Sequence, residues 1–466
     1  MQRNDVVKGV FIVVPVAVLC LLYGLWLVMD TPVYVESLIA GGVALLIYAL
    51  LYIRFVPKAF DFVMGADQET KSVAVQRTST IGVRELLRLV CMLAIGRCVY
   101  MLGAFLWSLY LNGYTETVFE IQHIWADHRF AGQIISIANK GYAVETPEFV
   151  GKYLNLLFPP FYSLIVRLIS PFYLSTIRAG FFVSNINAIV SGIILYLLVM
   201  HDSDRRSAVR ALWYYSILPP SFLLTCTIPA STFLLLSLLS IYCARKRFFV
   251  FSAVLGAMAA LTERIGIVLV VSLLLEFFNT MTREYRSLNE VTWRFYLKKG
   301  LTGFSFILVP LGFITYLVIN RMVGGSFFAY VGYLQDMYAS EFALFYRVFG
   351  AQTERFIDAY RTFDLTSAFG LYLPSLLVAL SSLALILVKG KELRVSYLAY
   401  FMVCFPVLYS QTGIIDGPRQ LFCCFPIIIA MMQLTKNRIV DVLMSLLCIA
   451  GSVFYLGMYV AGWPVV

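Results

Sequence analysis

Charged residues are scarce in this chain. Of its 466 residues, 13% are Asp, Glu, Lys or Arg, whereas 61% are hydrophobic. A soluble domain averages about 25% charged and about 45–50% apolar residues. The shortage of charge therefore excludes a soluble enzyme of this size, a disordered chain and a coiled coil. A polytopic membrane protein remains, and an aromatic content of 15% favours helices over a barrel.

Cysteine pairs and metal-binding motifs are also lacking. The nine cysteines lie mostly in or beside apolar runs, and no Cys-x-x-Cys occurs, which excludes a disulfide scaffold. His123 and His128 flank Asp127, but no third strong ligand follows at helical spacing. The long loops predicted below contain no Asp-x-Asp. We therefore expect neither a metal nor another cofactor.

The apolar runs are long enough for membrane-spanning helices, each of which needs about 20 apolar residues. The sequence predicts an all-α, polytopic membrane protein with about thirteen spans. One further stretch, 156–173, contains three prolines and Arg167 and is expected to be re-entrant or interfacial. The first run is too long for a signal-peptide core, so it is expected to be a retained helix. The predicted spans are 9–29, 38–53, 89–111, 179–200, 208–225, 231–244, 248–262, 265–278, 300–320, 366–388, 395–410, 420–434 and 439–461.

Lys and Arg are distributed unequally between the loops. If the N-terminus is cytoplasmic, 24 of the 36 Lys and Arg residues are cytoplasmic and 11 lie on the opposite side, with Arg97 inside a span. Such an excess is the usual signal of orientation. The net charge of +10 is thereby explained, and no nucleic-acid partner is expected. The segments then placed outside are the long loops 112–155 and 321–365 and the turns 226–230, 263–264 and 411–419.

The first long loop contains the carboxylate best suited to chemistry. Asp127 follows Trp125 just outside a predicted helix. Ionisable groups near the bilayer are costly and often functional, although an ordinary loop carboxylate fits the same position. Asp416 is the next candidate because it lies three residues before Arg419.

Several short motifs occur in an order that resembles the GPI mannosyltransferase II (PIG-V-like) family of GT-C glycosyltransferases, including its bacterial members. The resemblance covers residues from about 89 to 435 and rests on the order of the motifs and on the sides of the membrane that they occupy. The matching residues are Arg97, Ile137-Ala138 with Gly141-Tyr142, Phe158, Pro160, Tyr162 and Arg167, Ser184-Asn185, Pro220, Thr262 with Gly266, and Pro418-Arg419 with Phe425-Pro426.

The resemblance implies a sugar transferase that uses a polyprenyl-phosphate-linked donor at the outer leaflet. One carboxylate must take the proton of the acceptor hydroxyl, and Asp127 is the candidate. A fixed cation must stabilise the departing phosphate, and arginine suits phosphate oxygens because of its planar fork. Arg419 is the first candidate, followed by Arg167 and Arg264. Candidates for binding substrate are Trp125, His128, Tyr142, Tyr162 and Asp416, although an interfacial belt also explains the aromatic residues.

Three departures from the family pattern leave other functions open. Ala126 separates the Trp and Asp that are adjacent in the family, Ala230 takes the place of a glutamate, and Glu263 takes the place of an arginine. A catalytically degenerate subunit or scaffold of a glycosylation complex, with a partner subunit, is therefore an alternative. A lipid or solute transporter is a weaker one, because the sequence shows no clear internal repeat.

The predicted organisation has three parts. Residues 1–88 form two additional helices and a basic loop, residues 89–435 form the GT-C-like core, and residues 436–466 form a last helix. The expected location is a bacterial inner membrane, with the N-terminus in the cytoplasm and the active loops outside.

Overall fold

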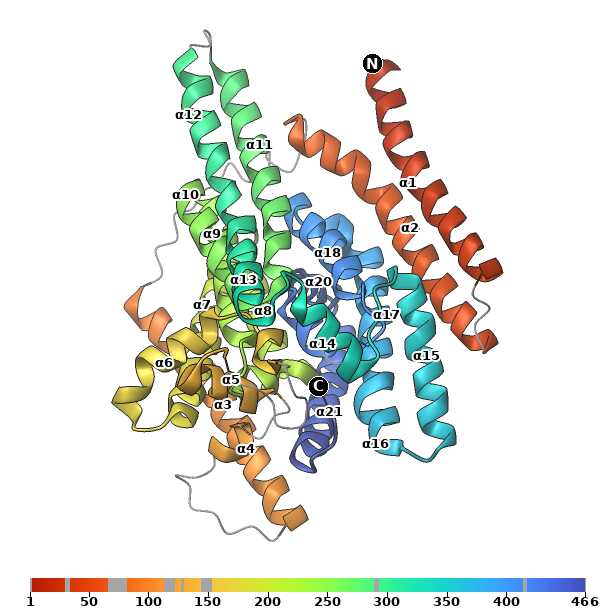
Figure 1. Cartoon of the computed structure of the whole chain (residues 1–466). Helices are drawn as coiled ribbons and strands as arrows, with labels where there is room; N and C mark the ends of the chain where they lie inside the picture. The colour runs from red at the N-terminus through yellow and green to blue at the C-terminus, as the bar shows by residue number, and fades with distance from the viewer. Residues whose placement is uncertain are drawn as a thin grey trace.

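The computed structural model of the chain is a bundle of helices (Figure 1). It describes residues 2–29, 34–65, 82–112, 122–126, 130–143, 153–288, 293–413 and 417–465. Across these ranges the strand-like pairing is limited to one isolated bridge between Phe342 and Gln411. The prediction of an all-α fold is therefore confirmed.

Eight stretches of helix in the described ranges are long and apolar enough to span a membrane, or ten if each of two bent pairs is one span. The chain is thus an integral, multi-pass membrane protein. The eight are α1 (Gln2–Met29), α2 (Val35–Val63), α3 (Val83–Asn112), α7 (Thr176–Asp202), η4 (Arg264–Val268) with α11 (Leu269–Ser287), α12 (Trp293–Phe304) with η5 (Ser305–Ile307) and α13 (Leu308–Gly324), α16 (Leu365–Ser367) with η6 (Ala368–Tyr372), α17 (Leu373–Lys389) and η7 (Gly390–Glu392), and α21 (Arg438–Val460).

This number is lower than the thirteen predicted spans because several apolar runs form short helices. Two of them, α10 (Phe249–Thr262) and α18 (Val395–Leu408), have 14 residues each. The prediction of one helix over 208–225 is wrong. There α8 (Arg205–Ile217) ends before Pro219 and Pro220, which begin a separate 3₁₀ segment. Proline lacks the N–H that a continuing α-helix needs.

The two bent pairs contact each other inside the bundle. In the first, η3 (Pro219–Thr225) and α9 (Ala230–Arg245) meet at 101°, and in the second, α19 (Gly417–Cys423) and α20 (Pro426–Leu434) meet at 80°. The Cys423 thiol lies 3.6 Å from the Ala230 carbonyl oxygen. Irregular backbone survives at membrane depth when protein surrounds it, and each pair helps to surround the other.

The stretch 156–173 does not cross the bundle. It contains α6 (Phe161–Tyr173), whose Tyr162 and Val166 are buried while Leu168 and Phe172 are exposed. The buried face packs on α7. An amphipathic helix with an exposed apolar face is typical of a membrane interface, and the position of this stretch in the membrane stays a prediction.

The second long loop, 321–365, is largely helical. It contains α14 (Ala329–Tyr338) and α15 (Phe345–Arg361), and α15 lies along α2 (Figure 1). The Tyr34 hydroxyl donates a hydrogen bond of 2.6 Å to Asp358, and the Arg361 guanidinium lies 4.7 Å from the centre of the Tyr34 ring. The first two helices therefore pack against the rest of the chain, and the division at residue 88 stays a prediction.

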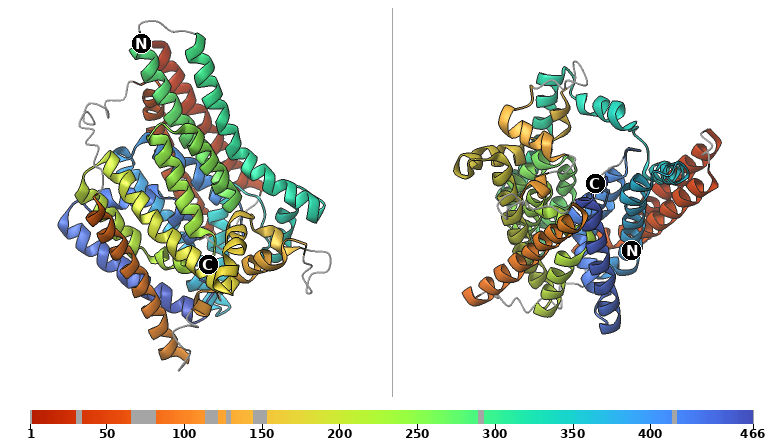
Figure 2. Two further views of the ribbon diagram at one scale, coloured as in Figure 1. Left: turned by 90° about the vertical axis from the view of Figure 1, so that its left-hand side faces the viewer. Right: turned by 90° about the horizontal axis from the view of Figure 1, so that it is seen from below.

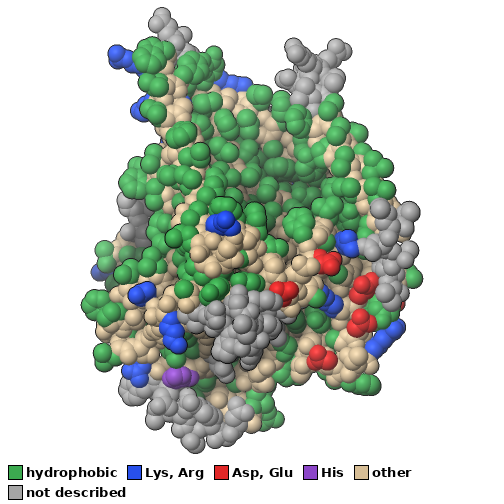
Figure 3. Space-filling view, in the orientation of Figure 1, with side chains coloured by type: hydrophobic (Ala, Val, Ile, Leu, Met, Phe, Trp, Pro, Cys, Tyr) green, Lys and Arg blue, Asp and Glu red, His purple; other side chains and the backbone are tan. Residues whose placement is uncertain are grey.

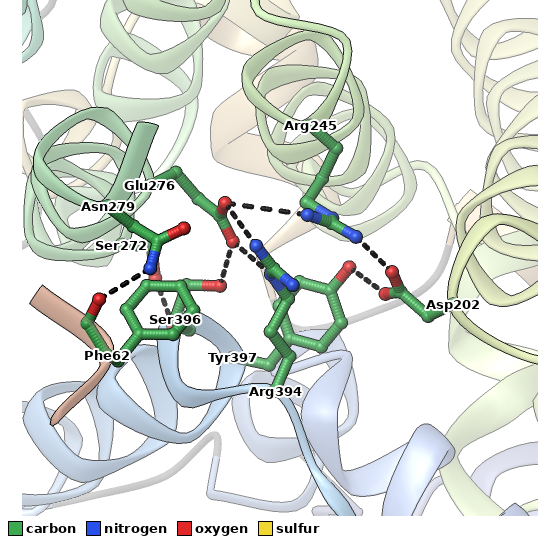
Figure 4. A network of polar contacts seen from close by, with 9 residues as sticks. All are labelled: Phe62, Asp202, Arg245, Ser272, Glu276, Asn279, Arg394, Ser396 and Tyr397. Carbon is green, nitrogen blue, oxygen red and sulfur yellow. Dashed lines mark hydrogen bonds and ion pairs between the residues drawn. The ribbon is translucent and has the colours of Figure 1, made fainter. Parts of the chain in front are cut away.

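A network of charged residues joins four helices (Figure 4). Glu276 of α11 is 2% exposed and pairs with Arg394, at 2.5 Å, and with Arg245 of α9, at 3.6 Å. Arg245 also pairs with Asp202 of α7, which accepts a hydrogen bond from Tyr397 of α18. Two acids balance two arginines, so no uncompensated charge is buried among these four side chains.

The surface is mainly apolar, as a lipid-facing surface must be (Figure 3). Acidic side chains visible in this view gather at the lower right, whereas Lys and Arg also occur at the upper left, on the projecting hairpin of α11 and α12. Figure 2 shows that this hairpin and α1 extend beyond the rest of the bundle in the same direction.

Candidate functional site

A pocket of about 250 Å³ lies where the ends of several helices meet. Its walls come from η2 (Leu154–Leu157), the break between α10 and η4, α13, α14, the end of α18 and α19. We call it the Glu263 pocket. Its polar lining consists of Glu263, Arg264, Ser410, Gln411 and Gln420, and its apolar lining of Phe130, Leu157, Phe158, Ile265, Ile267, Phe313, Tyr330, Leu334, Val407 and Leu408.

Glu263 and Arg264 lie at the break that ends α10. The backbone of Glu263 is extended (φ −141°, ψ 138°), and its N–H donates to the Ala259 carbonyl. Gly266 then packs directly on α10, because a Cβ at this position would lie 2.5 Å from the carbonyl carbon of Ala259. Glycine is required for so close an approach of two backbones. The resulting turn holds residues 263 and 264 at the pocket wall.

Glu263 forms an ion pair with Arg419 of α19. Arg419 Nη1 lies 2.8 Å from Glu263 Oε1, and the two side chains are only 7% and 15% exposed. Burial makes such a pair sensitive to the loss of either partner, because the other charge would remain uncompensated. Glu263 lines the pocket, as does Gln420 beside Arg419. Arg419 is thus connected to the pocket by its ion pair with the lining residue Glu263.

Arg264 is held against another part of the wall, formed by Tyr330 and Leu157. Its guanidinium lies 4.9 Å from the centre of the Tyr330 ring, and Nη1 is 3.4 Å from the Leu157 carbonyl oxygen. A guanidinium on an aromatic face is stabilised electrostatically while its N–H groups remain usable. Two consecutive residues, one acidic and one basic, therefore have partners on different walls of the pocket.

Hydrogen bonds fix the segment that forms a third wall. The Asn155 amide donates to Ser136 Oγ and to the Gly141 carbonyl, and Tyr316 donates to the Leu156 carbonyl at 2.6 Å. Tyr142 donates to the Phe158 carbonyl at 2.8 Å. Burial raises the pKa of the Tyr142 phenol above its ordinary value, so this hydroxyl stays a donor.

Tyr142 and Arg419 do not line the pocket but bind residues that do, whereas three other predicted site residues are absent from the lining and lie elsewhere. Trp125 is fully buried and stacks 6.0 Å from Tyr459, while Tyr162 donates to the Gly180 carbonyl between α6 and α7. Arg167 is on the exposed side of α6. Of the three arginine candidates, Arg419 and Arg264 are brought to the Glu263 pocket, and Arg167 is not placed there.

Asp127, His128 and Asp416 lie outside the described residues. Asp127 precedes the pocket residue Phe130 by three positions in the sequence, and Asp416 precedes α19 by one. Across the described ranges, no group of three or more His, Cys, Asp or Glu side chains could hold a metal ion.

The turn at 226–230, which the sequence predicts on the outer side, is buried in protein. Cys226, Thr227, Ile228 and Ala230 are at most 1% exposed. The Thr227 N–H donates to the Trp125 carbonyl, so α4 (Gln122–Ala126) covers the turn. The turn therefore belongs to the core, and the side of the membrane on which it lies stays a prediction.

The pocket also contains residues that the sequence did not mark as candidates. Tyr330, Gln411 and Gln420 lie far apart in the chain, and Tyr330 comes from a stretch that the sequence presents as a loop. Glu263 was visible only as a departure from the family pattern. The sequence does contain one signal for its importance: Glu263 and Arg264, an acidic and a basic residue, are adjacent in an apolar region at the point where α10 ends before Gly266.

Comparison with known proteins gives a weak likeness of fold. No protein-family model and no curated protein matches the sequence. ArnT from Cupriavidus metallidurans in the apo state matches with a TM-score of 0.42 and 13% identity, over 68% of this chain and 56% of that one. The oligosaccharyltransferase of Archaeoglobus fulgidus, tethered to an acceptor peptide, matches with a TM-score of 0.35 and 11% identity, over 79% and 55%. The chain spans about half the length of these two proteins, to which it is similar at a level too low to carry an argument about function.

Proposed function

We propose that this chain is a membrane glycosyltransferase of the GT-C type. It transfers a hexose, with mannose as the first candidate, from a polyprenyl-phosphate-linked donor to a lipid, glycan or protein acceptor. The reaction takes place on the extracytoplasmic side of a bacterial inner membrane. The observation that carries the proposal is the Glu263 pocket, in which one arginine lines the wall and a second is paired with a pocket carboxylate.

The composition of the pocket suits such a donor. Phosphate requires a cation with N–H donors, which Arg264 and Arg419 can supply. Aromatic side chains such as Tyr330 and Phe158 offer faces against which the apolar side of a sugar ring can pack. The isoprenoid tail of the donor stays in the lipid beside the helices while its phosphate enters the pocket.

The chemistry divides between a base and a cation. Asp127 takes the proton of the acceptor hydroxyl as its oxygen bonds to C1 of the sugar, and the bond between C1 and the phosphate oxygen breaks. The phosphate leaves with the bonding electrons, and Arg419 stabilises the charge. Asp416 is the second candidate for the base, since it stands next to α19 in the sequence.

A degenerate subunit that serves as a scaffold is the second candidate function. The ion pair between Glu263 and Arg419 favours this function, because Glu263 binds the arginine that a transferase would use to bind phosphate. The buried turn at Ala230 points the same way. A transferase binds a lipid-linked donor and a scaffold binds a partner subunit. Only the transferase consumes the donor.

Sugar transfer by the purified full-length protein tests the proposal. Radiolabelled polyprenyl-phosphate-mannose and crude membrane acceptors are supplied to the wild type, Asp127→Asn, Asp416→Asn and the control Glu341→Gln, which removes an exposed carboxylate. We expect transfer by the wild type and Glu341→Gln and a loss of about 100-fold or more in Asp127→Asn. Transfer that survives in Asp127→Asn but not in Asp416→Asn moves the base to Asp416. Absence of transfer with several sugars and acceptors, while the protein remains folded, contradicts the proposal and favours the scaffold.

A further inference from the structure

Arg419 needs an anion even when no substrate is bound. Its side chain is 7% exposed, and a buried guanidinium without a counter-charge is strongly destabilising. Glu263 supplies that charge at 2.8 Å. Because a carboxylate and a phosphate present similar oxygen pairs to the arginine fork, each can occupy the same donors.

Glu263 links this arginine to the pocket, because its carboxylate both lines the pocket and binds Arg419. The carboxylate lines the pocket, whereas Arg419 is not among the pocket-lining residues of the described chain. Arg419 Nη1 donates to Glu263 Oε1, so a phosphate in the pocket must compete with the carboxylate for this donor. A contact between that phosphate and Arg419 Nη1 therefore requires the carboxylate to move.

The local backbone and surroundings of Glu263 allow such a movement. The residue lies in an extended break between α10 and η4, outside regular helix. Ser410, Gln411 and Gln420 also line the pocket, and their donors can bind a displaced carboxylate. Arg264, the next residue, adds a second positive charge to the same lining.

We propose that Glu263 is an exchangeable anion that occupies the donor-phosphate position on Arg419 until the donor displaces it. This inference rests on the proposed function and adds a residue that sets the affinity for the donor. The exchange keeps Arg419 neutralised in both states. After transfer, the carboxylate competes for Arg419 again, which promotes release of the polyprenyl monophosphate product.

Binding of polyprenyl monophosphate tests the exchange without requiring transfer. Radiolabelled undecaprenyl monophosphate is titrated against the purified full chain in detergent. We expect Glu263→Gln to bind about tenfold more tightly than the wild type, because the phosphate no longer competes with a carboxylate for a desolvated charge. Arg419→Gln is expected to bind weakly, and Glu263→Gln combined with Arg419→Gln no more tightly than Arg419→Gln alone.

Glu341→Gln is the matched control. The backbone of Glu341 is hydrogen-bonded to Thr412, so this residue lies beside the pocket segment 410–413. Its side chain is exposed, and the substitution removes one negative charge there. Its affinity is expected to equal that of the wild type. Equal tightening in Glu341→Gln would mean that general charge, and not the ion pair, governs binding, and would overturn the proposal.

A second variant covers the case in which Glu263→Gln does not fold. Glu263→Asp retains the charge but has a shorter side chain, which weakens the ion pair with Arg419. We expect this variant to bind undecaprenyl monophosphate about threefold more tightly than the wild type. Unchanged or weaker binding in the folded variants would identify Glu263 as a positioning residue and overturn the exchange. If the variants tighten but no protein transfers sugar, the exchange stands and the proposed transferase activity fails.

Discussion

Asp204 shows how a single side chain fixes the start of a helix. It precedes α8, accepts a hydrogen bond of 2.6 Å from the Ser207 hydroxyl and accepts another from the Arg206 N–H. The Ser207 hydrogen bond, followed by those from the backbone, lowers the pKa of this carboxyl below its ordinary value. The ionised form is therefore preferred in the folded state.

This preference predicts a pH-dependent contribution to stability. A carboxyl with a lowered pKa in the folded state stabilises the protein above its unfolded pKa of about 3.9, and the contribution is lost as the pH falls through the folded value. Asp204→Ala is expected to lose about 1 kcal/mol at neutral pH. Asp204→Asn keeps the cap without titrating, so thermal unfolding in detergent should show a smaller loss of stability on acidification than in the wild type. Parallel acid profiles for the wild type and Asp204→Asn would contradict this assignment.

Only some of the candidate site residues lie together in the structure. Arg264 and Arg419, which the sequence analysis named as candidates for binding phosphate, are both found at the Glu263 pocket, and their roles stay predictions. The ion pair of Glu263 with Arg419 could not be predicted, because their pairing depends on how α10 and α19 come together across 156 positions. Trp125 looked like a site residue, yet its large apolar ring is buried against Tyr459.

At the scale of elements, the charged network of Figure 4 connects α7, α9, α11 and α18. Its members come from four separate stretches of sequence, and Ser396 adds a hydrogen bond of 2.5 Å to Glu276. Because Glu276 faces two arginines, its removal leaves Asp202 alone to balance Arg245 and Arg394. The network is therefore expected to contribute strongly to the packing of these helices.

A pair of variants on one helix measures this contribution. Glu276→Gln is expected to lower the free energy of unfolding by about 3–5 kcal/mol. Glu284→Gln, two turns further along α11, breaks more exposed pairs with Lys299 and Arg247 and should cost about 0–1 kcal/mol. Denaturant or thermal unfolding in detergent distinguishes the two. Equal losses for both variants would show that the burial of Glu276 has no special effect.

The elements themselves were predicted unevenly. Long apolar runs such as those of α2 and α7 were found because hydropathy alone identifies them. The short helices α10 and α18 look like spans in the sequence, since an apolar run does not reveal whether lipid or protein surrounds it. In contrast, α15 was missed because its polar face, which includes Glu354 and Arg355, resembles a loop.

At the scale of the whole molecule, the distribution of charge predicts one orientation in the membrane. Arg286, at the end of α11, is expected in the cytoplasm, and Phe363, 85% exposed after α15, is expected outside.

Arg286→Cys and Phe363→Cys can each be labelled with a membrane-impermeant maleimide in intact cells. We expect labelling of Phe363→Cys before permeabilisation and of Arg286→Cys only afterwards. The reverse pattern would invert the topology and place the Glu263 pocket on the cytoplasmic side. The unsubstituted chain, which has exposed thiols at Cys20, Cys91 and Cys98, gives the background.

The contact between the two bent pairs has a consequence for biosynthesis. Ala230 and Cys423 meet in the core, but they are 193 residues apart in the chain. At about 5–20 residues per second, the ribosome needs roughly 10–40 s to make the second pair after the first. During this interval the broken backbone around Pro219–Ala230 lacks the neighbour that encloses it. We therefore expect newly made chains to depend on the insertion machinery for shelter until α19 is synthesised.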